Sequence, residues 1–340
     1  MSEYARFLEG SERDFARAQT PAERLHLDVV LLLPMLTIMS TGLFVLFSAS
    51  DGDWGTVNRQ IRNFVVGFAV LLVAAQIRVD TLQRWAPALY LGALLLLLLV
   101  PFFGVGAKGA QRWLSLGFIR FQPSEIMKIA MPLMVAAWVV RHALPPRPST
   151  TATALLIIAL PAAAIATQPD LGTAILVGAS GAFVVFMAGV SWWQIFSGAL
   201  AALGCIWPAW LFLLRDYQKQ RILTLFDPEA DRLGAGWNII QSKTAIGSGG
   251  WSGKGYLQGT QSHLDFLPES QTDFIIAVLA EEWGLRGVLL LLLLYGFVVA
   301  RGLWISLQAQ TSYGRLLAST ITLTFGVYVV VNMGMVAGIL

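Results

Sequence analysis

The sequence has few charged residues for its length. They make up 13% of the 340 residues, whereas hydrophobic residues make up 56%. The mean hydropathy of +0.67 excludes a soluble globular domain. The formal net charge of +3 is scattered along the chain and forms no basic stripe with interleaved aromatic residues. Nucleic acid is therefore not an expected partner.

Cysteine and histidine are also scarce. The single cysteine, Cys205, lies in an apolar run and cannot form an intrachain disulfide. His142 and His263 are isolated loop positions, which we interpret as solvated side chains. The sequence contains no Cys/His spacing typical of a zinc site and no Ser/His/Asp set. Neither metal-centred hydrolysis nor a serine nucleophile is indicated.

Long apolar runs without strict alternation dominate the chain, which favours membrane-spanning helices over barrel strands. Each run holds roughly 17–29 residues, enough for a hydrocarbon core of about 30 Å. The predicted fold class is all-α, a polytopic membrane helical bundle. We predict nine spans, at residues 27–49, 60–77, 86–103, 124–140, 151–167, 171–189, 192–214, 272–300 and 315–340.

The basic residues of the short connecting segments predict the orientation. The larger set holds Arg6, Arg13, Arg17, Arg24, Arg78, Arg84, Arg141, Arg147, Arg301 and Arg315. The opposite set holds Arg59, Arg62, Lys108, Arg112 and Arg120. The richer side is expected to be cytoplasmic. This places an N-terminal tail (1–26) inside and a large loop (215–271) between the seventh and eighth spans outside, within a single transmembrane domain (1–340).

Every predicted cytoplasmic loop is short and leaves no room for a nucleotide-binding domain. If the protein is an enzyme, its chemistry is extracytoplasmic and its donor substrate arrives already activated. A lipid-linked donor meets this condition. The odd number of spans leaves the C-terminus outside, and we expect a tenth span beyond residue 340.

A first candidate site is the segment from Arg120 to Lys128, where Gln122 precedes a predicted helix start. Glu125 and Lys128 are i,i+3 neighbours on one helix face. A charge inside a bilayer costs about 2.5–3.5 kcal/mol on insertion scales, so such charges usually face a cavity. One interpretation is a helix start with a local ion pair. The other is a pair that lines a polar cavity, with Lys128 available to a diphosphate.

A second candidate is the glycine-rich stretch from Gly234 to Gln261, which contains Lys243, Ser248 and Lys254. Glycines let backbone N–H groups approach an anion closely, and the lysines would add positive charge. The stretch matches neither a Walker loop nor a dinucleotide fingerprint. A flexible surface loop is the alternative interpretation.

A third candidate is Asp273, at the mouth of the eighth span. Ser270 stands three residues earlier, which resembles a capping box. Alternatively, partial burial would raise the pKa of Asp273 and make it a general base. Deeper in the same span, Glu281 and Glu282 are interpreted mainly as structural, paired with Arg286. The alternatives are that they are neutral or that they belong to the cavity.

Several of these segments together resemble the SEDS family of bacterial membrane proteins, named for shape, elongation, division and sporulation. The match covers nearly the whole sequence, and the Gln-Ser-Lys and Gly-Thr-Gln forms favour the elongation member over the division member. Asp170, which the residues alone assign to a tight turn with possible access to the cavity, falls within one of the matching motifs. These motifs are Lys108–Leu114, Arg120–Lys128, Gln168–Thr173 and Gln241–Phe274.

The resemblance implies a peptidoglycan glycosyltransferase that polymerises lipid II at the outer face of the bacterial cytoplasmic membrane. It places the essential aspartate of the family on Asp273 and the conserved Glu and Lys on Glu125 and Lys128. It also implies a class B penicillin-binding protein transpeptidase as partner, within the elongation machinery. Ile276 departs conservatively from the usual Phe.

We therefore expect inverting glycosyl transfer with Asp273 as general base. The candidate cations for the diphosphate are Lys128, Lys243, Lys254, Arg120 and Arg221. The other candidate substrate-binding residues are Glu125, Gln122 and Ser248. A divalent cation (Mg²⁺ or Mn²⁺) held by Asp273 is an alternative to the base. The rival functions are a lipid II flippase, which would also carry membrane-embedded charges, and a scaffold without catalysis.

Overall fold

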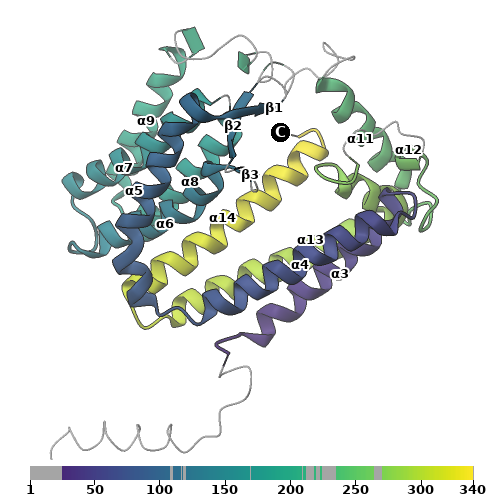
Figure 1. Cartoon of the computed structure of the whole chain (residues 1–340), viewed down its shortest axis with the longest axis horizontal. Coiled ribbons are helices and arrows are strands. Elements are labelled where there is room, and N and C mark those ends of the chain that lie inside the picture. Colours follow the sequence, from purple (N-terminus) through teal and green to yellow (C-terminus); the bar gives the residue numbers. More distant parts are fainter. Residues whose placement is uncertain are drawn as a thin grey trace, which may run out of the picture.

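The structure is a computed structural model that describes residues 25–107, 110–115, 117, 120–168, 170–208, 210–211, 218–219, 223, 235–263 and 270–339. Long helices dominate it, and the predicted membrane helical bundle is confirmed (Figure 1). The first helices along the described chain are α3 (Val29–Ala49), α4 (Trp54–Ala75), α5 (Val79–Phe103), α6 (Pro123–Val140) and α7 (Pro148–Thr167). The later ones are α8 (Leu171–Met187), α9 (Trp192–Pro208), α11 (Ala235–Gly249), α12 (Thr260–His263), α13 (Ile275–Gln308) and α14 (Ser312–Val336).

The number of candidate spans differs slightly from the prediction. Among the described residues, seven helices are long and apolar enough to cross a membrane, against nine predicted spans. The difference lies at predicted spans 171–189 and 192–214, where α8 and α9 have 17 residues each. At a rise of about 1.5 Å per residue such helices reach roughly 26 Å, the lower limit for a spanning helix.

Helix α4 begins at Trp54 rather than at residue 60. The carboxylate of Asp53 accepts hydrogen bonds from the N–H groups of Gly55 (2.9 Å) and Thr56 (3.0 Å), which satisfies donors that the first turn otherwise leaves free. Hydropathy alone missed this start because polar residues fill the first turns of the helix.

A small antiparallel sheet, absent from the prediction, joins α5 to α6. Its strands are β1 (Val105–Ala107), β2 (Ala110–Ser115) and β3 (Arg120–Phe121), in the order β1-β2-β3. Leu114 pairs with Phe121 and Ser115 with Arg120. The sheet lies at the same end of the bundle as the C-terminal end of α14 (Figure 1). It therefore fixes the entry into α6 at that end.

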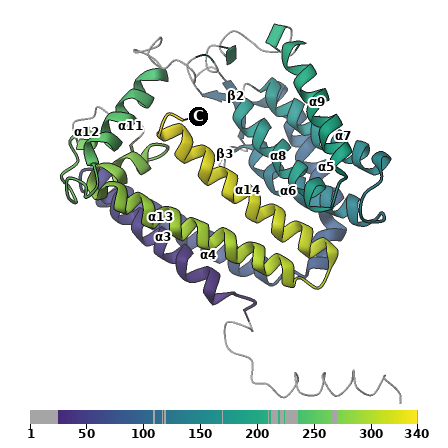
Figure 2. The same ribbon diagram turned by 180° about the vertical axis from the view of Figure 1, so that it is seen from behind.

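Two apolar cores lie on opposite sides of α14. One is built from α5 to α8 and the first turns of α14, with Leu97, Met131 and Val177 fully buried. The other is built from α3, α11, α13 and the last turn of α14, with Val278 and Val336 fully buried. The reverse view shows α14 between the two groups of helices (Figure 2). α14 is thus the element that both halves of the molecule share.

Helix α13 is interrupted at Gly284, whose backbone has φ 66° and ψ −164°. The loop that follows α11 fills the interruption. The N–H of Leu285 donates to the carbonyl of Gly250 (2.9 Å), and the N–H of Gly255 donates to the carbonyl of Glu282 (3.0 Å). The predicted span over 272–300 is therefore present as α13, but it is broken at Gly284. A short helix precedes the break and a long one, up to Gln308, follows it.

The segment predicted as an extracytoplasmic loop (215–271) contains α11 and α12. Ala245 of α11 is fully buried in the same core as Val278 of α13. Ser242 donates a hydrogen bond from its hydroxyl to the carbonyl of Val336 at the end of α14 (2.6 Å). These contacts hold α11 beside the ends of both helices.

Candidate functional site

Asp273 lies in the turn before α13 and is exposed. The side-chain amide of Asn332, on α14, donates a hydrogen bond to the backbone carbonyl of Asp273 at 3.5 Å. The N-cap of α13 is Phe274, without a side-chain capping bond, so the predicted capping role of this segment is wrong. Within the described part of the chain, the carboxylate of Asp273 has no hydrogen bond or ion pair and is available to a ligand.

Glu125 and Lys128 form the predicted ion pair in the first turns of α6. The ammonium of Lys128 donates a hydrogen bond to the carboxylate of Glu125 at 2.7 Å. The same ammonium lies 5.3 Å from the ring centroid of Tyr328 on α14, within the usual range of a cation–π contact. The side chain of Glu125 is 57% exposed and that of Lys128 only 23%. Glu125 therefore lies nearer to solvent, and Lys128 faces α14.

Tyr328 and Asn332 connect Lys128 and the backbone of Asp273 to the same helix. They stand four residues apart on α14, which is about one helical turn and roughly 6 Å of rise. Lys128 contacts one of them and Asp273 the other. Two residues far apart in the sequence therefore meet neighbouring turns of one helix, at the end where the sheet lies.

Lys243 lies near the same end of α14. Its side chain packs against Gly338, closely enough that a Cβ at Gly338 would collide with its Cε. Lys243 itself is exposed. Two predicted lysines therefore contact this part of the molecule. Lys128 contacts Tyr328 on α14, and Lys243 contacts Gly338 in the turn that follows α14.

Gln122 and Asp170 connect the sheet side of the site. The amide of Gln122 donates to the carboxylate of Asp170 at 3.1 Å, and the guanidinium of Arg112 lies 3.8 Å from the same carboxylate. Arg112 also donates to the carbonyl of Gln168 (3.2 Å). Asp170 is thus more than a turn residue. Arg120, on β3, is exposed beside this network.

Lys254 lies elsewhere, at the break in α13. Its ammonium is 2.6 Å from the carboxylate of Glu281, which is fully buried and also accepts hydrogen bonds from the N–H groups of Thr260 and Gln261. The predicted structural pairing of Glu281 is confirmed, but its partner is Lys254 rather than Arg286. The N–H of Lys254 donates to the carbonyl of Glu281 (3.0 Å), so this part of the glycine-rich loop serves the helix break.

The remaining predicted substrate-binding residues are Ser248 and Arg221. The hydroxyl of Ser248 donates to the carbonyl of Ala245 one turn earlier in α11 (2.8 Å), while its side chain stays at the surface. Arg221 lies outside the described residues. The predicted set therefore separates into a group around the end of α14 and a group at the break in α13.

Sequence reasoning missed Tyr328 and Asn332. Both lie in an apolar stretch of α14, and their i,i+4 spacing places them on one helix face. An amide in the last turns of a spanning helix is a signal of the same kind as a membrane-embedded charge. It could have directed attention to α14.

The candidate site contains few groups that could hold a metal ion. Among the residues that the structure describes, no group of three His, Cys, Asp or Glu side chains comes together. Asp273 offers a single carboxylate. Magnesium often binds through one or two carboxylates together with substrate phosphates. The donor set therefore suits a cation shared with a diphosphate, but it does not form an all-protein metal cage.

Residues 23–340 match the FtsW/RodA/SpoVE family, described as cell cycle protein. The chain belongs to this family. The match covers both groups of helices, the sheet and all predicted site residues.

Two relatives of known name align with most of this chain. The peptidoglycan glycosyltransferase MrdB of Escherichia coli (strain K12) is 51% identical over 318 residues, which cover 94% of this chain and 86% of that protein. The probable peptidoglycan glycosyltransferase FtsW of Alkalilimnicola ehrlichii is 37% identical over 331 residues, covering 93% of this chain and 82% of the relative.

Solved structures resemble the fold. A chain from a peptidoglycan synthase complex that coordinates polymerization and crosslinking superimposes with a TM-score of 0.79 at 31% identity, covering 92% of this chain and 87% of that one. The rod shape determining protein RodA of Thermus thermophilus gives a TM-score of 0.65 at 27% identity, covering 90% of this chain and 84% of that one.

Proposed function

We propose that this protein is a peptidoglycan glycosyltransferase that polymerises lipid II into glycan strands during cell elongation. The observation that supports the proposal is that the backbone of Asp273 and the ammonium of Lys128 contact neighbouring turns of α14. An unpaired acid and a cation at one end of a membrane bundle suit transfer between lipid-linked sugars. The names of the relatives, peptidoglycan glycosyltransferases MrdB and FtsW, support the same reaction.

The proposed reaction is a single inverting displacement. Asp273 accepts the proton of the acceptor hydroxyl as its oxygen attacks the anomeric carbon of the donor. The bond from that carbon to the diphosphate breaks, and the diphosphate leaves with the bonding electrons. Lys128 stabilises the negative charge that develops on it, and such charge stabilisation is often the largest catalytic contribution. A positioned general base typically contributes about 10²–10⁴-fold.

The other predicted residues receive roles according to their place. Lys243 and Arg120 are exposed near the proposed site and are candidates for further diphosphate contacts. Gln122 and its partner Asp170 hold the start of α6, which orients Glu125 and Lys128. Lys254 and Ser248 have contacts within the protein and are weaker candidates for substrate binding. Arg221 stays in the proposed set on sequence grounds alone.

A divalent cation is an alternative role for Asp273. Mg²⁺ or Mn²⁺ bridging this carboxylate and the diphosphate would supply charge at the leaving group. A pH profile of the polymerisation rate, measured with and without chelator, separates the two roles. A base gives an acidic limb that survives chelation, whereas a cation site loses activity on chelation at every pH.

The proposed setting is the bacterial cytoplasmic membrane, with the N-terminus inside and the site outside. The match to a chain of a peptidoglycan synthase complex supports a transpeptidase partner, which we propose to be a class B penicillin-binding protein of the elongation machinery. Lipid II would reach the site from the surrounding bilayer. Short cytoplasmic connections agree with a donor that needs no nucleoside triphosphate.

The test is polymerisation of purified lipid II by the Asp273→Asn variant in detergent. Asparagine keeps the size of the side chain and removes the base, so we expect a loss of at least about 10²-fold in rate. Asp80→Asn is the matched control, because Asp80 is exposed at the opposite end of the bundle and pairs only with Arg78 among the described residues. Its rate should equal that of the wild type.

Two outcomes would contradict the proposal. One is an Asp273→Asn variant that makes glycan strands at a near-normal rate. The other is a folded wild type, assayed with its partner present, that makes none. The assay in detergent also separates an enzyme from a lipid II flippase. Flipping requires a bilayer, whereas polymer can form in detergent solution.

A further inference from the structure

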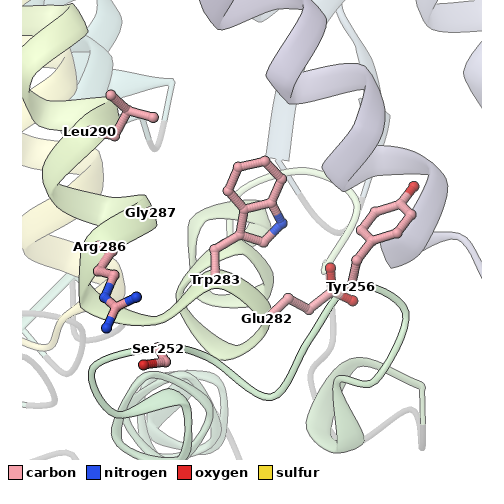
Figure 3. A pocket seen from close by; sticks show the side chains of 7 residues that line it. All are labelled: Ser252, Tyr256, Glu282, Trp283, Arg286, Gly287 and Leu290. Atoms are coloured by element: carbon pink, nitrogen blue, oxygen red, sulfur yellow. The ribbon is translucent and has the colours of Figure 1, made fainter.

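Two cavities lie side by side near the break in α13, and Tyr256 borders both. The first has a volume of about 370 Å³ and lies against the break itself, where Ser252, Glu282, Trp283 and Arg286 line it (Figure 3). The second, of about 380 Å³, is a groove between α3 and α4. The first cavity carries the polar side chains of Ser252, Glu282 and Arg286 among apolar ones, and the second is almost wholly apolar, so together they offer an amphipathic surface.

Arg286 supplies the positive charge of the first cavity. It stands two residues after the break, in the first turn of the long second part of α13, where the helix dipole favours an anion. Its backbone N–H donates to the carbonyl of Trp251 (3.4 Å), and its guanidinium lies 5.9 Å from the Trp251 ring. The side chain is exposed, so its donors can reach a ligand from outside the protein.

The carboxylate of Glu282, the negative group of the first cavity, points away from Arg286. Glu282 is 1% exposed and accepts a hydrogen bond from the hydroxyl of Ser48 on α3. In Figure 3 its carboxylate lies near Tyr256, while Arg286 lies on the far side of Trp283. Arg286 therefore determines the sign of charge that the open part of the cavity attracts.

The groove between α3 and α4 is suited to a hydrocarbon chain. Phe44, Phe47, Trp54 and Ile61 line it, and Phe44 and Trp54 are 61% and 64% exposed. The hydroxyl of Tyr256 donates to the carbonyl of Phe44 (3.1 Å), which fixes the ring at the boundary between groove and polar cavity. A chain leaving the polar cavity past Tyr256 would therefore enter an apolar groove directly.

The position of the two cavities indicates a ligand from the bilayer. In the turns of α13 that follow Arg286, three leucines are exposed: Leu289 (47%), Leu290 (53%) and Leu293 (66%). Trp251 and Trp283 are exposed at the level of Arg286, and tryptophan is enriched where a membrane meets water. These neighbours favour a position of Arg286 at the depth of lipid headgroups, next to an apolar helix face.

We propose that these cavities form a binding site for one membrane phospholipid, separate from the proposed polymerisation site. The phosphate contacts the guanidinium of Arg286 and the hydroxyl of Ser252, and one acyl chain lies in the groove between α3 and α4. Tyr256 packs between headgroup and chain. A bound lipid joins α3, α4 and the broken α13 at the place where the loop after α11 replaces helical hydrogen bonds.

The test is native mass spectrometry of the purified protein with phosphatidylglycerol as the probe, supported by thermal unfolding in detergent. We expect the wild type to retain one phosphatidylglycerol molecule and to unfold at a higher temperature when the lipid is present. Arg286→Gln removes the charge-assisted contact and should weaken retention about tenfold. Ile61→Trp fills the groove and should weaken it to a similar extent.

Two variants serve as matched controls. Arg315→Gln removes an exposed arginine at the start of α14, and Val70→Trp adds the same bulk to α4 outside the groove, at a residue that is 62% exposed. Both should bind as the wild type does. Binding is measured without polymerisation, so the result is independent of the proposed enzymatic activity.

Three results would overturn the site. The first is equal retention of phosphatidylglycerol by the wild type, Arg286→Gln and Ile61→Trp. The second is an equal thermal shift from sn-glycerol 3-phosphate alone, which would make the acyl groove irrelevant. The third is binding of an uncharged monoacylglycerol to the wild type as tightly as phosphatidylglycerol, which would show that the phosphate contributes nothing.

Discussion

Gly253 and Gly284 allow two stretches of backbone to come into contact at the break in α13. Gly253 has φ 80°, and a Cβ there would collide with the carbonyl oxygen of Glu282. A Cβ at Gly284 would collide with the N–H of Gly253. Close packing of backbones therefore requires glycine at both positions, a reason that the sequence pattern did not indicate.

Gly253→Ala should destabilise the protein, because it adds both an unfavourable backbone conformation and a collision. Residues held in such conformations cost about 1–3 kcal/mol each. The measurement is thermal unfolding in detergent. Gly250→Ala is the control: it has φ 56° but open space around a Cβ, so only the conformational cost should remain. Equal unfolding temperatures for the two variants would contradict the close contact.

Lys254 neutralises a buried carboxylate. Lys254→Met leaves Glu281, which is fully buried, without its cation, and breaking a buried pair in this way typically costs about 3–5 kcal/mol. The exposed pair Arg78–Asp80 provides the comparison, since its side chains are 83% and 55% exposed. Arg78→Met should change the unfolding free energy by less than about 1 kcal/mol. A small effect of Lys254→Met would show that solvent reaches Glu281.

Lys128 is the residue on which the proposed leaving-group stabilisation depends. Lys128→Met should reduce polymerisation of lipid II by about 10²–10³-fold, the usual effect of removing one group that stabilises developing charge. The protein should remain folded, because the partner Glu125 is exposed and can be solvated. Arg78→Met serves as the activity control. Polymerisation by Lys128→Met at a near-normal rate would remove this lysine from the mechanism.

At the scale of the elements, Asp28 links α3 to α13 by hydrogen bonds. Its carboxylate caps α3 by accepting from the N–H of Leu31 (2.8 Å), and it accepts two hydrogen bonds from Arg301 of α13 (2.7 and 3.3 Å). The hydrogen bonds from Arg301 hold the pKa of Asp28 below its ordinary value of 3.8. The paired carboxylate therefore favours the folded state near neutral pH.

Because the pKa of Asp28 is lower in the folded than in the unfolded state, its contribution is present above the unfolded-state pKa and is lost as the pH falls through the folded-state pKa. Asp28→Asn should lower the unfolding temperature at pH 7. The difference from the wild type should stay constant down to about pH 5, begin to shrink near the ordinary value of 3.8 and disappear below the folded-state pKa. A difference that grows on acidification would contradict the assignment.

At the scale of the whole molecule, the sequence was most informative where the bilayer imposes the constraint. Apolar runs of sufficient length identified the helices, and membrane-embedded charges identified Glu125, Lys128 and Glu281 as residues to explain. The break at Gly284 escaped prediction because it depends on a loop some thirty residues away that supplies backbone partners. Hydropathy contains no information about such long-range backbone hydrogen bonds.

The candidate site was predictable in part for the same reason. The family resemblance and local chemistry pointed to Asp273 and Lys128. The amide of Asn332 marks α14 as unusual, but only the fold shows that Asp273 and Lys128 both contact this helix. Lys254 illustrates the converse. A lysine among glycines is typical of an anion site, yet only the fold reveals that the buried carboxylate of Glu281 is its partner.

The most direct test of the central claim measures lipid II binding and polymerisation on the same sample of Asp273→Asn. If Asp273 acts on the acceptor hydroxyl while Lys128 holds the diphosphate, this variant binds lipid II about as tightly as the wild type and forms glycan strands at least about 10²-fold more slowly. Glycan strands formed at the wild-type rate, or a loss of binding equal to the loss of rate, would contradict this account.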